Sequence, residues 1–144
     1  MELAWGVVLT LLSFLAWAGQ VIYTLSPRWG ARLQLGEAEA DVDPVFFADA
    51  RGEAAWDSVI LWVLPVAGIL LLQGSPLWPH FGLVGGGSYL YFSGRNIVTR
   101  RMLHKQGIRI GTARNIFTGY LFCTLWGIMA LITIVMATVA LMEF

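Results

Sequence analysis

Long apolar runs separated by short polar segments dominate the chain and predict helices that cross a membrane. The first run extends from about residue 3 to 25, and the others cover about 56–72, 79–98 and 116–141. A helix needs roughly 20 mostly apolar residues to span a bilayer, and each run reaches or approaches that length. The pattern predicts an all-α membrane protein, a single domain in which four transmembrane helices form a bundle.

A short helix along the membrane surface, over residues 45–57, is expected before the second span. Asp43 and Pro44 match the start of a helix, with Asp at the N-cap and Pro in the first turn. Phe46 and Phe47 are placed to enter the headgroup region of the bilayer from this helix. Within the second span, Pro65 predicts a kink.

Basic residues cluster in a loop, residues 94–114, between the third and the fourth span. The loop contains no acidic residue, and the cytoplasmic loops of membrane proteins carry an excess of Lys and Arg. We therefore place this loop on the cytoplasmic side, together with the loop over residues 26–55, and both termini outside. All nine Lys and Arg residues then share the cytoplasmic face.

Composition agrees with the membrane class and narrows the chemistry. Hydrophobic residues make up 58% of the chain, charged residues only 12%, and the mean hydropathy is +0.70, far from soluble domains. The net charge is zero, but most acidic residues lie in the loop 26–55. The single Cys123 excludes an intramolecular disulfide and a Cys-x-x-Cys motif. His80 and His104 are expected on opposite membrane faces, so no haem or other cofactor is expected.

The acidic and the basic loop share the cytoplasmic face, and two interpretations are open. In the first, the opposite charges pair with one another, each exposed pair contributing little to stability. In the second, Arg100, Arg101 and Lys105 hold a phosphate while Asp49 or Glu53 acts beside it as acid or base. No catalytic residue is assigned.

The basic loop is also the candidate site for anionic lipid headgroups. Each cation near an anionic membrane surface contributes about 1 kcal/mol to binding. Nucleic acid is not an expected partner, because the acidic loop on the same face repels phosphates. The residues expected to contact lipid are Arg95, Arg100, Arg101, Lys105 and Arg109.

A second candidate set consists of Asp49, Glu53 and Asp57, which recur every four residues along one face of the expected surface helix. Such spacing is common on solvated helices, so the set is either an acidic site or a solvated face. An EF-hand is excluded, because the glycine and the oxygen ligand required after Asp41-x-Asp43 are missing. We assign no metal site.

Small residues indicate where helices approach one another closely. Gly82 and Gly86 form a GxxxG pair in the third span, and Gly119 and Gly127 lie on a stripe of small residues in the fourth. Such positions let two backbones approach within a bilayer. We expect these four glycines at helix–helix contacts, with a second copy of the chain or with helices of a larger complex among the expected partners.

Together these patterns favour a structural or accessory subunit of a membrane complex, acting by helix packing and by its charged cytoplasmic face. A bacterial inner membrane is expected, because the chain is compact and carries no eukaryotic sorting signal. The alternatives are an enzyme acting on a phosphorylated lipid and an oligomeric transporter. For a transporter, Gln20, Asp57 and Arg95 all fall near the inner interface, and no ionisable residue is expected at mid-membrane.

Overall fold

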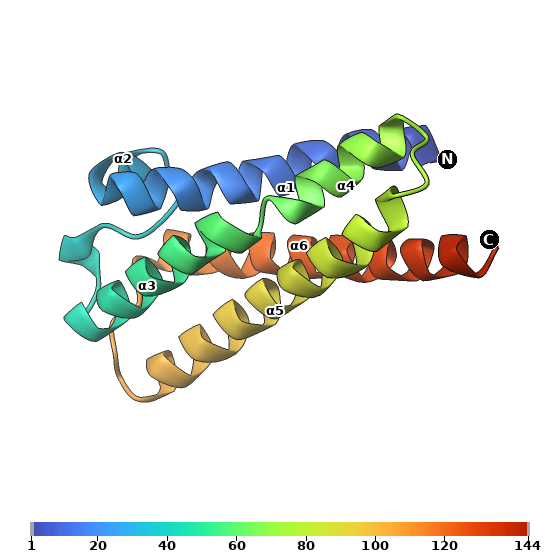
Figure 1. Ribbon diagram of the computed structural model, residues 1–144. Helices are drawn as coiled ribbons and strands as arrows, with labels where there is room; N and C mark the ends of the chain where they lie inside the picture. Colours follow the sequence, from blue (N-terminus) through green and yellow to red (C-terminus); the bar gives the residue numbers. More distant parts are fainter. Residues whose placement is uncertain (1, 144) are drawn as a thin grey trace.

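The computed structural model describes residues 2–143 and is almost entirely helical (Figure 1). The predicted all-α class is confirmed. A short helix and a single 3-10 turn lie in the connection between the first long helix and the next. The helices are α1 (Glu2–Leu25), α2 (Pro27–Arg32), α3 (Pro44–Ile60), α4 (Val63–Leu72), α5 (Trp78–Lys105) and α6 (Ala113–Met142), and the 3-10 turn is Glu39–Asp41.

Three helical stretches of the described chain are long and apolar enough to cross a membrane: Leu3–Leu25, Pro44–Leu72 and Ala113–Met142. They support an integral membrane protein built of helices. Helix α5, which contains the predicted third span 79–98, is not among them, because it is rich in glycine and ends in a basic segment. Four spans and external termini therefore stay predictions.

The predicted surface helix 45–57 is not a separate element. Asp43 is the N-cap residue and Pro44 the first residue of α3, as predicted, but the helix continues to Ile60 and α4 follows after a two-residue break. Pro65 explains the break, since a proline lacks an N–H and its ring clashes with the carbonyl four residues earlier, here Leu61. The kink expected from Pro65 thus lies one turn before it.

Both loops on the charged face are shorter than predicted. Residues 94–105 of the expected basic loop 94–114 belong to α5, which leaves only 106–112 as the connection to α6. Residues 94–105 include Arg, Met, Leu and Lys, all good helix formers. The expected acidic loop 26–55 contains α2 and the beginning of α3. Local helix propensity therefore outweighs the polar composition of both stretches.

The two connections meet at one end of the molecule. Val42 forms an isolated antiparallel bridge with Ile110, and the N–H of Asp43 donates to the carbonyl of Arg109 at 2.8 Å. Both chain ends lie at the opposite end, beside the α4–α5 connection (Figure 1). The structure thus places the two connections predicted to share the cytoplasmic side at the same end.

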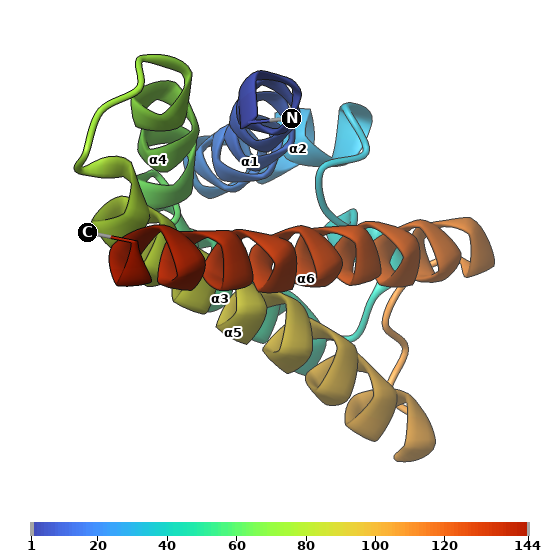
Figure 2. The same ribbon diagram turned by 90° about the vertical axis from the view of Figure 1, so that its right-hand side faces the viewer.

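The helices pack in two groups. Helix α6 packs mainly on α5, and α1 packs mainly on α3 and α4, which also contact α5 (Figure 2). The central core includes Leu9, Leu64 and Tyr89, each with 0% of its surface exposed. The hydroxyl of Tyr89 donates to the carbonyl of Ser13, which joins α5 to α1. Between α1 and α6, by contrast, the direct contact is small.

The glycines expected at helix contacts lie against other parts of the same chain. Gly82, Gly86 and Gly127 lie where α5 and α6 meet, and a Cβ at Gly86 would come within 2.7 Å of an α6 side chain. Gly119 faces the guanidinium of Arg100 on α5, at 3.5 Å from an added Cβ. At Gly82, Gly86 and Gly127 the absent side chain therefore permits packing of α5 on α6 within this chain.

Gly85 marks the closest approach of α5 to α4. A Cβ at this position would lie 2.8 Å from both the backbone N and the Cα of Leu64. Since backbone atoms cannot move aside cheaply, we expect Gly85→Ala to lower the free energy of unfolding by about 1–2 kcal/mol. Gly87→Ala is the matched control, because nothing lies within 4 Å of a Cβ there. Titration with SDS in mixed micelles measures both, and equal losses would contradict the prediction.

Candidate functional site: a cavity between α1 and α6

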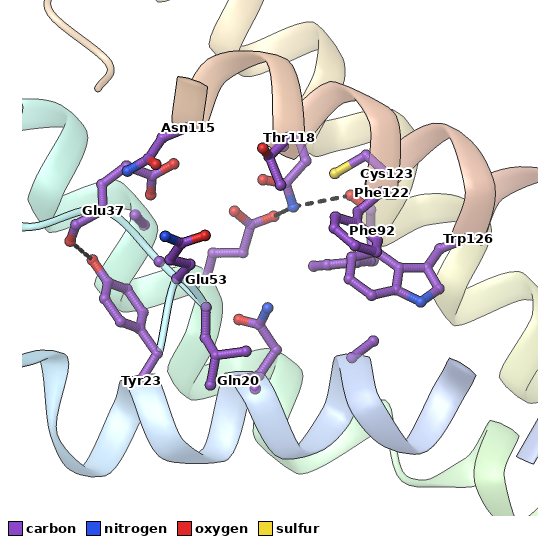
Figure 3. Close-up of a pocket in the computed structure, with 18 of the residues that line it drawn as sticks. Gln20, Tyr23, Glu37, Glu53, Phe92, Asn115, Thr118, Phe122, Cys123 and Trp126 are labelled. Carbon is purple, nitrogen blue, oxygen red and sulfur yellow. Dashed lines mark hydrogen bonds between the residues drawn. The ribbon is translucent and has the colours of Figure 1, made fainter. Parts of the chain in front are cut away.

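A cavity of about 160 Å³ lies between α1 and α6 (Figure 3). Side chains from α1, α3, α5 and α6 line it, together with residues 34–37 of the connection between α1 and α3. Small residues on both sides leave this space: Ala16 and Gly19 on α1, and Gly119 on α6. We call this space the α1–α6 cavity.

One part of the α1–α6 cavity is aromatic. The rings of Phe92 and Trp126 have centroids 5.9 Å apart, and Phe122 stacks on Trp126 at 5.4 Å. The indole N–H of Trp126 donates to the carbonyl of Leu12 on α1 at 3.0 Å, which fixes the orientation of the ring. Cys123, the single cysteine, is buried beside these rings and also lines the cavity. This part suits an apolar group.

Residues 34–37, which we call the covering segment, close another side of the cavity. The hydroxyl of Tyr23 on α1 donates to the carbonyl of Glu37 at 3.1 Å. Gly36 lies directly on the Tyr23 ring, since a Cβ there would come within 2.5 Å of a ring carbon. Gln34 has a φ of 59°, a left-handed conformation that is uncommon outside glycine. The covering segment therefore turns sharply and is held against α1 by its contacts with Tyr23.

Six polar side chains connect the covering segment to α5 and α3. Arg100 binds Glu37 at 2.6 Å, and its Nε donates to the amide oxygen of Asn96 at 3.4 Å. The amide nitrogen of Asn96 donates to Glu53 at 2.9 Å. Arg95 forms ion pairs with Glu53 at 2.8 Å and with Asp49 at 2.7 Å. We call the set Glu37, Asp49, Glu53, Arg95, Asn96 and Arg100 the charge chain.

Arg100 and Glu37 are the most buried ion pair of the charge chain. Their side chains are 12% and 6% exposed. Removing two charges from water is costly, and only close geometry with further hydrogen bonds offsets that cost. Arg100 has both, because it also bonds Asn96 and lies 5.1 Å above the centroid of the Phe46 ring. The pair therefore holds the covering segment against α5.

The cations expected to bind lipid fall into two groups. Arg95 and Arg100 are engaged with carboxylates of the charge chain. Arg101 and Lys105, near the end of α5, and Arg109, in the connection to α6, are exposed. None of these three forms an ion pair with a described carboxylate. Arg101, Lys105 and Arg109 therefore lie outside the charge chain.

The acidic set on α3 is directed toward α5, with Asp57 buried, Glu53 10% exposed and Asp49 32% exposed. Asp49 and Glu53 share Arg95, so the charge-pairing interpretation describes both of them. Asp57 is 4% exposed, and its Oδ2 has no hydrogen-bond partner among the described residues. Within residues 2–143, no group of three His, Cys, Asp or Glu side chains is arranged to hold a metal ion.

Several cavity residues escaped the sequence analysis. Asn96 lies four residues before Arg100, so on a helix the two side chains share one face. This spacing is the sequence signal that could have indicated a contact between them. Asn115 and Thr118 lie one turn apart on α6 and both line the cavity. In the sequence, Glu37 is one of several acidic residues in the predicted loop 26–55. No local pattern distinguishes it from Glu39, which is exposed.

Comparison with protein-family models, curated proteins and solved structures found no match to this chain. The function of the chain is therefore inferred from the chemistry of the α1–α6 cavity. Its two distinguishing features are an aromatic part around Trp126 and a polar part beside the charge chain.

Proposed function

We propose that the protein is a membrane-embedded binding protein that holds a lipid-like amphiphile in the α1–α6 cavity. The proposal rests on the lining of the cavity, which is apolar in one part and polar in another. Phe92, Phe122 and Trp126 offer an apolar, aromatic wall, whereas Glu53 and Arg100 belong to a polar one. Ligand sites typically combine an apolar lining with a few placed polar groups, and an amphiphile has the same two parts.

The position of the α1–α6 cavity also suits a membrane lipid. Its polar wall lies near the end of the molecule where the two connections meet, the expected cytoplasmic end. All nine Lys and Arg residues lie in these connections or in the halves of α3, α5 and α6 that adjoin them. The outer faces of the helices on either side expose Leu11 and Leu15 on α1, and Leu121 and Leu125 on α6. These faces are typical of lipid contact. The apolar part of a bound amphiphile would extend between α1 and α6 toward the surrounding acyl chains.

Filling the cavity tests this function. Gly119 lines the cavity, and a Cβ there would lie 3.5 Å from the Arg100 guanidinium, an ordinary van der Waals contact. We expect Gly119→Leu to reduce the amphiphile that copurifies with the protein about tenfold, which corresponds to about 1.4 kcal/mol. The measurement is extraction of the protein purified in a mild detergent, followed by mass spectrometry of the extract.

Thr124→Leu is the control, because it adds similar bulk to an exposed position of α6. It should retain the wild-type amount of bound amphiphile. The same amphiphile content in the wild type and in both variants would mean that the cavity is not the binding site.

An accessory subunit, the function favoured by the sequence, is the second candidate. It is supported by the outward face of α5, where Val84 and Tyr91 are exposed and nothing lies within 4 Å of a Cβ at Gly87 or Gly94. An open glycine face permits the close approach of another helix. If this candidate holds, Gly94→Leu abolishes copurification of a second copy or of another membrane protein, and leaves the isolated chain folded. Light scattering and protein mass spectrometry read out this result.

A further inference from the structure

Four uncharged polar side chains line the α1–α6 cavity without a side-chain hydrogen bond inside the described part of the chain; Gln34 is exposed, and the other three are half-buried. The Gln20 side chain comes from α1, and those of Asn115 and Thr118 come from α6, on the other side (Figure 3). None of the side chains of Gln20, Asn115 and Thr118 donates or accepts a hydrogen bond within the part of the chain described. Asn115 uses only its backbone N–H, which donates to the hydroxyl of Thr112. Two amides and a hydroxyl together offer both donors and acceptors to a ligand.

The charged side chains of the cavity wall already form ion pairs, Glu37 with Arg100 and Glu53 with Arg95. Arg100 already pairs with Glu37 at 2.6 Å, so a phosphate beside Arg100 would bring a second anion next to a carboxylate that is 6% exposed. An ammonium group could reach Glu53 only in competition with Arg95 and Asn96. A buried charge that loses its partner is strongly destabilising, so ligand heads of either sign are disfavoured.

From these contacts we infer that the bound amphiphile has an uncharged head that carries hydroxyl or carbonyl groups. The inference rests on the proposed function and specifies its ligand class. Gln20, Asn115 and Thr118 bind the head through hydrogen bonds, while the charge chain excludes phosphate monoesters and amines. A site built to hydrogen-bond a hydroxyl discriminates against ligands that lack one, because its own polar groups are then left unpaired.

Cys123 supplies a native reporter for the test. It is the single cysteine and lines the cavity, so a bound ligand shields its thiol from alkylation. The full chain is placed in nanodiscs with equal mole fractions of one of three amphiphiles that share a twelve-carbon chain. These are monododecanoylglycerol, dodecyl phosphate and dodecyltrimethylammonium. Intact-protein mass spectrometry follows alkylation by N-ethylmaleimide.

We expect the glycerol ester to slow the alkylation of Cys123 about fivefold, which corresponds to about 1 kcal/mol, and both charged amphiphiles less than about twofold. Thr118→Val and Gln20→Leu remove hydrogen-bonding groups with little change in size and should reduce this protection. A chain with Cys123→Ser and Thr124→Cys carries its thiol on an exposed position of α6 instead. Alkylation of this control chain measures any effect of the amphiphiles on the partitioning of N-ethylmaleimide or on the pH at the membrane surface.

The outcomes separate this inference from the function on which it rests. Stronger protection by dodecyl phosphate or by dodecyltrimethylammonium would overturn the uncharged head and retain amphiphile binding in the cavity. Protection by the glycerol ester that is unchanged in Thr118→Val and Gln20→Leu would overturn the role of these side chains. If no amphiphile protects Cys123 and Gly119→Leu also retains its copurifying amphiphile, the proposed function itself is wrong.

Discussion

Replacement of Arg100 by methionine is expected to lower the free energy of unfolding by about 3–5 kcal/mol, the cost of leaving a buried charge without its partner. Methionine has a similar length and keeps the apolar contact with Phe46, but it removes the charge that faces Glu37 at 2.6 Å. The Glu37 side chain is 6% exposed, so water cannot replace the lost guanidinium without movement of the covering segment. Titration with SDS in mixed micelles measures the loss.

Two further variants show whether the ion pair causes this loss. Arg101→Met alters the adjacent, exposed cation of α5 and should change stability by less than about 0.5 kcal/mol. Adding Glu37→Leu to Arg100→Met removes the stranded carboxylate and should recover much of the stability. If the double variant is as unstable as Arg100→Met, the penalty comes from packing rather than from an unpaired charge.

Loosening the covering segment should expose the α1–α6 cavity to water. In Gly36→Ala, the added Cβ would lie within 2.5 Å of the Tyr23 ring in the closed arrangement. The clash costs about 2 kcal/mol only while the covering segment lies against Tyr23, and not when it has moved away. It therefore raises the population of the state with the covering segment moved away about 30-fold. We therefore expect iodoacetamide, a small and polar reagent, to alkylate Cys123 about 30 times faster in this variant.

Control variants separate opening from altered thiol chemistry. Gly36→Ala introduces no charge, so a change in the ionisation of the thiol cannot explain faster alkylation. Gly52→Ala on α3, where nothing lies within 4 Å of an added Cβ, should react like the wild type. Glu37→Gln, which weakens the contact to Arg100, should also react faster, whereas Glu39→Gln, at an exposed position, should not. A wild-type rate in Gly36→Ala would show that the covering segment does not control access.

Much of the fold follows from local features of the sequence. Apolar runs of sufficient length predict helices in lipid, because every backbone polar group must be paired inside the segment. The start of α3 at Pro44 and the break before Val63 follow from the covalent geometry of Pro44 and Pro65. The limits of the loops were less well predicted, since charged residues are also good helix formers and α5 continues through them to Lys105.

The pairing of charges was decided by the tertiary structure. Glu37 and Arg100 are 63 residues apart, and Asp49 and Arg95 are 46 residues apart. Along the sequence, Arg100 cannot be told from Arg101, because a helix of this composition can turn either residue inward. The packing of α5 against α3 and α6 buries Arg100 and exposes its neighbour, and only this burial makes an ion pair structurally important.

The cavity shows the same division between sequence and structure. Gly86 and Gly119 both belong to patterns of small residues that predict close helix contacts. At Gly86 the prediction describes the structure, because α6 lies against α5 and its side chains occupy the space. At Gly119, by contrast, α1 packs mainly on α3 and α4 and does not fill the space beside α6, so the absent side chain leaves part of the α1–α6 cavity open. The sequence determines where a side chain is missing, but the packing of the helices determines whether a neighbour fills that space.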